Sequence, residues 1–246
     1  SMKSSVKVER VARPSFFARN KRSVSLWVGL MLVAMLSPFL FYLSNGVSSQ
    51  AKIPSDFVLI PGGTLYTDNG SDGVKVDSFY ISKYETTMGQ YTAVCATPMV
   101  VDDNQLPLSQ VGLINMAMYC NELSKKEGYD GFYQIEKDEI KYNPLGNGYR
   151  LPTVEEWKYA AKGNQKYFKL PENIKQYAWF SENSGNSAYH PGQLYPNDYG
   201  IYDMFGNIAE LAWNNSDDSY YSPVTMGGSY ATSYRELGMT VGRDDL

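Results

Sequence analysis

The apolar positions of the first fifty residues follow a different pattern from those of the rest of the chain. Residues 24–43, VSLWVGLMLVAMLSPFLFYL, form a run of twenty residues without a charge. As a helix rising about 1.5 Å per residue, this run matches a hydrocarbon core about 30 Å thick. We therefore predict a transmembrane helix at residues 24–43, a basic cytoplasmic segment before it at residues 1–23, and a polar linker after it at residues 44–55.

The charges around this run set its expected orientation. Seven basic residues and one acidic residue precede it, and the next basic residue after it is Lys52. Basic residues gather on the cytoplasmic side of membrane helices. We therefore expect a single-pass anchor in the inner, or cytoplasmic, membrane, with the following domain in the periplasm or outside the cell. A cleavable signal peptide is the alternative, because SSQA before Lys52 resembles a cleavage site.

Beyond the linker the pattern changes to short strands and helices. Apolar runs rich in β-branched and aromatic residues indicate strands, and apolar positions at helical spacing indicate helices. In chain order the pattern predicts strands at 57–60 and 74–81, helices at 86–95 and 111–127, a hairpin at 131–143 and a strand near 224–226. Most of the chain between 164 and 230 reads as loop, because Gly and Pro recur every few residues.

The stretch GNGYRLPTVEEWKYAAKG, residues 146–163, carries a clear helix start. Thr153 followed three residues later by Glu156 is a capping box, in which each side chain satisfies a backbone N–H at the helix start. The helix should begin at about Val154, bury Trp157 on one face and end at Gly163.

The charge balance of the domain limits its partners. Removing the seven basic residues and the one acidic residue before the apolar run from totals of 22 and 26 leaves 15 basic and 25 acidic residues, a net charge of about −10. An acidic domain of this kind does not favour nucleic-acid binding. We expect no nucleic-acid partner.

The chain has two cysteines, Cys95 and Cys120. Outside the cytoplasm they could form a disulfide, and closing a loop of this length would stabilise the fold by roughly 3 kcal/mol in the chain-entropy model. Two free buried thiols are the alternative, because the sequence does not fix the distance between them. Neither cysteine belongs to a CxxC or metal-binding spacing.

Seven segments follow the linker in this order: FVLIPGGTL, VDSFYISKYETTMGQY, MAMYCNELSKKEG, GYRLPTVEEWKYAAKG, YAWFSENSG, PNDYGIYDMFGNIAEL and MGGSY. Together they resemble the successive signature segments of the formylglycine-generating enzyme family, also called the sulfatase-modifying factor family. One such segment could arise by chance, but seven in the same order do not. That family's domain is a variant of the C-type lectin fold, so the resemblance implies a single irregular, loop-rich α+β domain over residues 56–246.

The residues that carry copper chemistry in this family are missing from the sequence. The family's sulfatase-oxidising enzymes bind copper with a cysteine pair just after the Gly-Gly-Ser segment, where this chain reads GGSYATSYRELGMTVGRDDL without a cysteine. We expect no copper and no formylglycine-generating activity. The segment also stops near Arg243, before the family's closing Gly-Phe-Arg strand, so we expect that strand to be shortened, replaced or supplied by another molecule.

Two other branches of the family frame the question of catalysis. One uses three-histidine iron sites, whereas this chain has only His190, which we interpret as structural or solvated. Another acts in periplasmic siderophore maturation and also lacks the cysteine pair. We expect a protein that is not an enzyme. An enzyme of the siderophore-maturation type is the alternative.

The resemblance also implies a structural calcium ion, bound by oxygen ligands as a hard cation requires. The family's ligand positions correspond here to the carboxylates of Asp203 and Glu210, the carbonyls of Gly206 and Ile208, and, for a second site, Asn183 and the Ser184 carbonyl. The alternative is that these carboxylates cap turns without an ion.

A polar and aromatic stretch, WNNSDDSYYS, follows the proposed calcium motif. Tyr offers contact area and small polar residues offer hydrogen bonds, a composition typical of adaptable recognition surfaces. A plain solvated loop is the alternative. The candidate binding surface, at positions 213–234 and just beyond, comprises Trp213, Asn214, Asn215, Asp217, Asp218, Tyr220, Tyr221, Tyr230, Tyr234 and Arg235.

These observations lead to three functional hypotheses. The first is a non-catalytic, membrane-anchored domain that binds a protein partner as a subunit or accessory of an envelope complex. The second is a ligand-binding or adhesin-like display protein that uses the 213–234 surface. The third is a periplasmic enzyme of the siderophore-maturation type.

Overall fold

The structure is a computed structural model that describes residues 9–10, 53–66, 73–96, 102–137, 139–143, 145–214 and 223–238. The chain divides into two compact units, one formed by residues 1–13 and 55–246 and the other by residues 14–54. The predicted membrane span at 24–43 lies outside the described residues. Among the helices that are described, none has the length and apolar character needed to cross a membrane.

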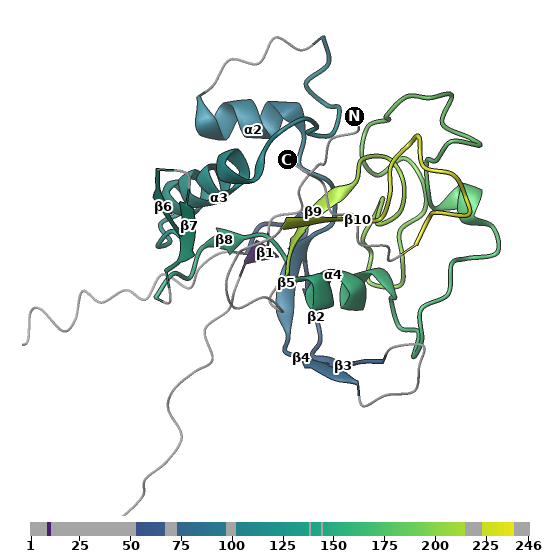
Figure 1. Ribbon diagram of the computed structural model, residues 1–246, viewed down its shortest axis with the longest axis horizontal. Coiled ribbons are helices and arrows are strands. Elements are labelled where there is room, and N and C mark those ends of the chain that lie inside the picture. Colours follow the sequence, from purple (N-terminus) through teal and green to yellow (C-terminus); the bar gives the residue numbers. More distant parts are fainter. Residues whose placement is uncertain are drawn as a thin grey trace, which may run out of the picture. The chain divides into compact units, whose positions relative to one another are not determined.

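A four-stranded antiparallel sheet lies at the centre of the larger unit (Figure 1). Its strand order is β2-β5-β1-β8. All four residues of β2 pair with all four of β5, from Phe57 opposite Ser82 to Ile60 opposite Phe79. The strands are β1 (Glu9–Arg10), β2 (Phe57–Ile60), β5 (Phe79–Ser82) and β8 (Tyr149–Arg150).

The part of the chain that the structure describes also forms three two-stranded sheets. Each is antiparallel, and the β9–β10 pair joins Glu210–Trp213 to a strand that comes after the proposed calcium motif. The pairs are β3 (Gly63–Leu65) with β4 (Val74–Val76), β6 (Tyr133–Glu136) with β7 (Glu139–Tyr142), and β9 (Glu210–Trp213) with β10 (Pro223–Met226).

Within the described residues, three α-helices pack around the sheets: α2 (Met88–Cys95), α3 (Leu113–Lys126) and α4 (Val154–Ala161). Capping boxes start two of them, with Thr87 and Gln90 in α2 and Thr153 and Glu156 in α4. Each box satisfies two backbone N–H groups that would otherwise have no partner at the helix start. The single 3-10 turn Ile174–Gln176 is the only helix described between α4 and β9.

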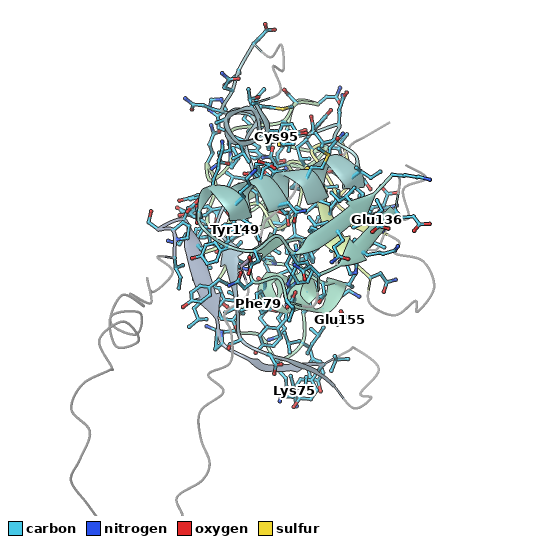
Figure 2. The ribbon with its side chains drawn as sticks, turned by 90° about the vertical axis from the view of Figure 1, so that its left-hand side faces the viewer. Lys75, Phe79, Cys95, Glu136, Tyr149 and Glu155 are labelled. Atoms are coloured by element: carbon cyan, nitrogen blue, oxygen red, sulfur yellow. The ribbon has the colours of Figure 1, made fainter. Side chains whose placement is uncertain are left out.

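Two hydrophobic clusters flank the central sheet. The first holds α4, with Trp157 fully buried, against β5, β9 and β10. The second holds α2 and α3 against the β6–β7 hairpin and β8, with Tyr149 and Cys120 fully buried. Figure 2 shows α3 between Cys95 of α2 and Tyr149 of β8, while Phe79 of β5 lies farther from this helix. The two clusters explain why a loop-rich chain can bury a sizeable core.

The α+β, loop-rich class predicted from the sequence is confirmed, and so are most of the elements. The predicted strand at 74–81 is two strands, β4 and β5, because residues 77–78 turn the chain from one sheet to another. The pattern missed β3, β8 and β9. All four residues of β9 are buried, so the strand lacks the alternation of apolar and polar positions that reveals a half-buried strand.

The structure describes two residues of the predicted cytoplasmic segment 1–23, namely Glu9 and Arg10 of β1. Glu9 and Arg10 pair with β5 on one side and with β8 on the other. The structure places these two residues in the same sheet as residues beyond the apolar run.

Candidate functional site

Asn207 organises the loops that replace regular structure in this half of the domain. It is fully buried and has a left-handed backbone, with φ 47°. Its side-chain oxygen accepts a hydrogen bond from the Tyr189 N–H (2.9 Å), and its amide donates to the Tyr189 carbonyl (3.0 Å). Its backbone N–H donates to the Trp179 carbonyl (2.7 Å), and its carbonyl accepts the Tyr230 N–H (2.7 Å). One residue thus joins three loop segments.

Glu85 supports Asn207 from the side of the central sheet. Its carboxylate is 1% exposed and accepts the Asn207 amide at 2.6 Å and the Ile208 N–H at 3.0 Å. A buried carboxylate is costly unless hydrogen bonds compensate it, and these two donors do so. Sequence analysis missed Glu85, because nothing in the letters KYETT distinguishes it from a helix-start acid.

Gly206 lets the backbone of this segment approach the neighbouring loop closely. Its φ is 75°, and a Cβ there would overlap the Trp179 carbonyl. Its N–H donates to the Gly227 carbonyl at 3.1 Å. A side chain at this position would separate the segments that Asn207 joins.

The carboxylates predicted as calcium ligands hold backbone and ring N–H groups. Asp203 is 3% exposed and accepts the Gly192 N–H at 2.6 Å. Glu210 is 1% exposed and accepts the indole N–H of Trp157 at 2.5 Å. Within the described ranges, no three carboxylate, imidazole or thiolate groups gather in a way that could hold a metal ion. Calcium at Asp203 and Glu210 stays a prediction.

The side chains of the second predicted calcium pair, Asn183 and Ser184, also form hydrogen bonds with loop backbone. The Asn183 side-chain oxygen accepts the Phe180 N–H at 2.8 Å, and its amide donates to the Ala178 carbonyl at 2.9 Å. The Ser184 hydroxyl donates to the Tyr230 carbonyl at 2.7 Å. The structure thus brings Ser184 and Tyr230, predicted for different sites, into direct contact.

The candidate binding surface divides into three parts. Trp213 is only 2% exposed, so its placement on a binding surface is wrong; it packs against Tyr133 with ring centroids 5.9 Å apart. Asn214 and Tyr230 are half-buried, whereas Tyr234 and Arg235 are exposed. Asn215, Asp217, Asp218, Tyr220 and Tyr221 lie outside the described residues.

The loop on which Tyr234 lies packs against the segment around Phe180. The Tyr234 N–H donates to the Glu182 carboxylate at 3.0 Å and 3.2 Å, and the Ser181 N–H donates to the Thr232 carbonyl at 3.0 Å. The hydrogen bond from the Ser181 hydroxyl, followed by the bond from the Tyr234 N–H, holds the pKa of Glu182 below its usual value. Figure 1 shows the corresponding yellow loop beside the green loops of residues 175–200.

Aromatic side chains on these joined loops are exposed or half-buried. Tyr195 is 62% exposed and contacts Tyr177, with ring centroids 5.9 Å apart. Tyr234 is 49% exposed and lies 6.3 Å from Phe180. Tyr189 stacks on Trp179 at 4.0 Å. We call Tyr177, Tyr189, Tyr195, Tyr230 and Tyr234 the loop surface.

The segment after Gly-Gly-Ser, where the resemblance placed a cysteine pair, forms a turn with hydroxyl groups. The Thr232 hydroxyl accepts the Ser229 N–H at 2.9 Å, and Ser229 is 2% exposed. His190 pairs with Asp103 at 2.6 Å, and both side chains are partly exposed. This pair joins the loop before α3 to the loop that precedes Asp203, in agreement with the structural interpretation of His190.

Both cysteines are free thiols in the structure. Cys120 is fully buried in α3, and Cys95 is half-buried at the end of α2. Burial raises the pKa of each thiol. Of the two alternatives that the sequence left open, the structure has the free thiols.

The fold and the loop geometry define a class of protein: an α+β domain whose long loops are held by buried polar side chains and present aromatic residues. The chain belongs to the family of the Sulfatase-modifying factor enzyme 1-like domain, which matches residues 44–244. Chaperone protein LppX of Paenibacillus barcinonensis is 31% identical over 227 residues, covering 76% of this chain and 80% of that protein.

Solved structures share the fold. Treponema denticola variable protein 1 has 24% identity and a TM-score of 0.64, covering 76% of this chain and 88% of that one. CarF has 24% identity and a TM-score of 0.64, with coverage of 77% and 92%. PvdO from Pseudomonas aeruginosa has 19% identity and a TM-score of 0.52, with coverage of 72% and 83%. At these identities the likeness concerns the fold alone.

Proposed function

We propose that this chain is a non-catalytic, chaperone-like domain that binds another protein through the loop surface. The observation that carries the proposal is its kinship with a protein named as a chaperone, over most of the length of both chains. As part of the same proposal, residues 24–43 anchor the domain outside the cytoplasm, where it serves a membrane or envelope complex.

The exposure of the tyrosines supports a binding role. Large aromatic side chains at a surface lower the free energy of the complex when a partner covers them, and Tyr is enriched where partners bind. Tyr195 and Tyr234 are exposed, although hydrogen bonds fix the backbone of both: the Tyr195 N–H donates to the Gln176 carbonyl at 2.8 Å, and the Tyr234 N–H donates to the Glu182 carboxylate at 3.0 Å. A fixed backbone reduces the entropy lost on binding.

The chemistry of the buried groups supports the same conclusion. Glu85, Asp203 and Glu210 are each at most 3% exposed and hold N–H groups of the loops. Carboxylates that bind backbone or ring N–H groups in this way position the loops that carry the loop surface. An acid that held a substrate would instead need an open approach from solvent.

The test is whether the full chain, in a mild detergent micelle, keeps an unfolded client protein in solution. Light scattering follows a chemically denatured client as it aggregates after dilution, with and without the chain. We expect the wild-type chain to delay aggregation at near-equimolar ratio. The double variant Tyr195→Ser/Tyr234→Ser should lose most of this effect, because it removes the two most exposed aromatic groups of the loop surface.

A matched control is available elsewhere on the domain. Tyr66 and Tyr167 are 39% and 44% exposed and contact each other at 6.0 Å beside β3. The variant Tyr66→Ser/Tyr167→Ser removes similar aromatic area and should retain the full effect. Equal loss in both double variants would reject the loop surface as the binding site. A wild-type chain that leaves the aggregation rate unchanged would reject the proposed function itself.

A further inference from the structure

The central sheet contains a strand position that a remote part of the chain fills with only two residues. Glu9 is in register with Ile81 of β5 and Arg150 of β8, and Arg10 is in register with Tyr80 and Tyr149. Residues 11–56 separate this short strand from β2 along the sequence. The strand position is interior, so any occupant pairs with both neighbours.

The two strands that flank this position are held without the help of β1. On one side, β5 pairs along its whole length with β2. On the other, the Tyr149 N–H donates to the Ser124 hydroxyl at 2.8 Å, and the Leu151 N–H donates to the Tyr133 hydroxyl at 2.9 Å. Both edges should therefore keep their positions when β1 leaves.

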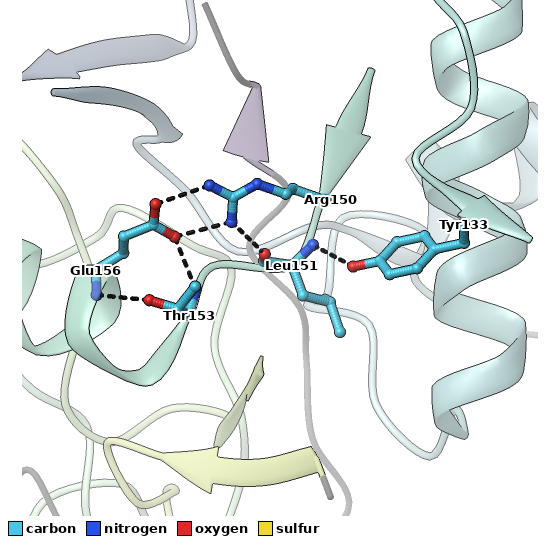
Figure 3. A network of polar contacts seen from close by, with 5 residues as sticks. All are labelled: Tyr133, Arg150, Leu151, Thr153 and Glu156. Atoms are coloured by element: carbon cyan, nitrogen blue, oxygen red, sulfur yellow. Dashed lines mark hydrogen bonds and ion pairs between the residues drawn. The ribbon is translucent and has the colours of Figure 1, made fainter. Parts of the chain in front are cut away.

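Arg150 gives the position a chemical preference. Its guanidinium binds the Glu156 carboxylate through two hydrogen bonds, of 2.7 Å and 2.8 Å, and also donates to the Leu151 carbonyl at 3.0 Å (Figure 3). These bonds fix the residue beside the purple arrow of β1 in Figure 3. Opposite charges at directly paired positions of neighbouring strands stabilise a sheet, and the residue of β1 in register with Arg150 is an acid, Glu9.

We propose that the position between β5 and β8 is a strand-binding site for an extended segment of a partner protein, with an acidic residue opposite Arg150, and that β1 is its resident occupant. Main-chain hydrogen bonds to both edges would supply affinity, and the register with Arg150 would supply selectivity. The site is separate from the loop surface and extends the proposed function.

The predicted membrane topology would regulate this site. A span at residues 24–43 with a cytoplasmic N-terminus would hold Glu9 and Arg10 across the membrane from β5. The position would then be open to a partner. In a chain whose N-terminus lies on the same side as the domain, β1 competes from a tethered position, at an effective concentration in the millimolar range.

The experiment uses the full chain with Glu9→Pro and Arg10→Pro. Proline lacks the N–H that a strand between two neighbours must donate, so both substitutions together should expel β1. The probe is a fluorescent peptide with the sequence of residues 5–13, SVKVERVAR. Fluorescence anisotropy should show about tenfold tighter binding to the double-proline chain than to wild type, because the tethered competitor is gone.

Two control peptides distinguish strand pairing from general attraction. The first carries N-methyl groups on the two backbone nitrogens that correspond to Glu9 and Arg10, and the second replaces that glutamate with lysine. Both should bind severalfold more weakly. Equal binding of the N-methylated peptide, or no binding of the unmodified peptide to a folded double-proline chain, would overturn the proposal.

Hydrogen exchange on the wild-type chain gives a second measurement, should the double-proline chain fail to fold. Millimolar unlabelled peptide should accelerate exchange at residues 9–10 while residues 80–81 and 149–150 stay protected. Unchanged exchange at residues 9–10 would also overturn the proposal. The client-aggregation assay with the Tyr195 and Tyr234 variants is unaffected by either outcome, so the two proposals can fail separately.

Discussion

The substitution Asn207→Ala tests whether one buried amide holds the loops together. It removes three side-chain hydrogen bonds, one to the Glu85 carboxylate at 2.6 Å and two to the Tyr189 backbone at 2.9 Å and 3.0 Å. A bond to a charged group contributes about 1.5–3 kcal/mol and a neutral one about 0.5–1.5 kcal/mol. The left-handed backbone of Asn207 adds about 1 kcal/mol for alanine. We therefore expect a loss of about 5 kcal/mol.

A loss of that size is a large part of the about 5–15 kcal/mol that stabilises a typical domain. The urea midpoint and the thermal midpoint of the purified chain would measure it, the latter falling by about 2–4 °C for each kcal/mol. Asn186→Ala is the matched control, because Asn186 has a similar backbone, φ 63°, but an exposed side chain. It should lose only about 1 kcal/mol. Equal losses in the two variants would refute the role assigned to the Asn207 side chain.

Three further predictions concern the charges and thiols. The hydrogen bond from His190, followed by the Gln105 N–H, holds the pKa of Asp103 below its usual value. The stability that Asp103 contributes is then present above its unfolded pKa of about 3.9 and is lost as the pH falls through the lower folded pKa. Asp103→Asn should therefore flatten the pH dependence of the urea midpoint below about pH 5, and an unchanged pH dependence would contradict this. Without reductant, a thiol reagent should label Cys95 before Cys120 and both after unfolding, because burial raises both pKa values and Cys120 is fully buried; a chain with no free thiol would instead contain the disulfide. The calcium site predicted at Asp203 and Glu210 should give a higher thermal midpoint in calcium than in EDTA, because an ion that binds only the folded chain stabilises it; equal midpoints would contradict that site.

Local signals in the sequence were sufficient for the helices and for most strands. The capping box at Thr153 and Glu156 marks the start of α4, and it forms as predicted because it depends on neighbours within one turn. The predicted hairpin around residues 131–143 is likewise a contact between close neighbours. In contrast, β9 is buried on both faces, so its pattern gives no period of two.

The candidate site could be predicted only in part, because its decisive contacts join distant residues. Asp203 and Glu210 were found through the resemblance, but the groups they bind, Gly192 and the Trp157 ring, are set by how the loops fold back. Glu85 lies 122 residues before Asn207, and no spacing rule connects them. Trp213 was mistaken for a surface residue because it begins a polar stretch, whereas it ends the buried strand β9.

The two proposed sites follow from one property of this fold, the distance along the sequence between residues that must pair. Asn207 fixes loops that have little strand pairing of their own, so the tyrosines of the loop surface have stable positions. The central sheet has the opposite arrangement, since its edges at β5 and β8 are fixed by other elements while the strand between them comes from residues 9–10. The loop surface rests on loops fixed by buried hydrogen bonds, which suits a partner that packs against it. The short strand β1 is held only by β5 and β8, which suits a partner strand that takes its place. We expect the same protein to bind partners in both ways.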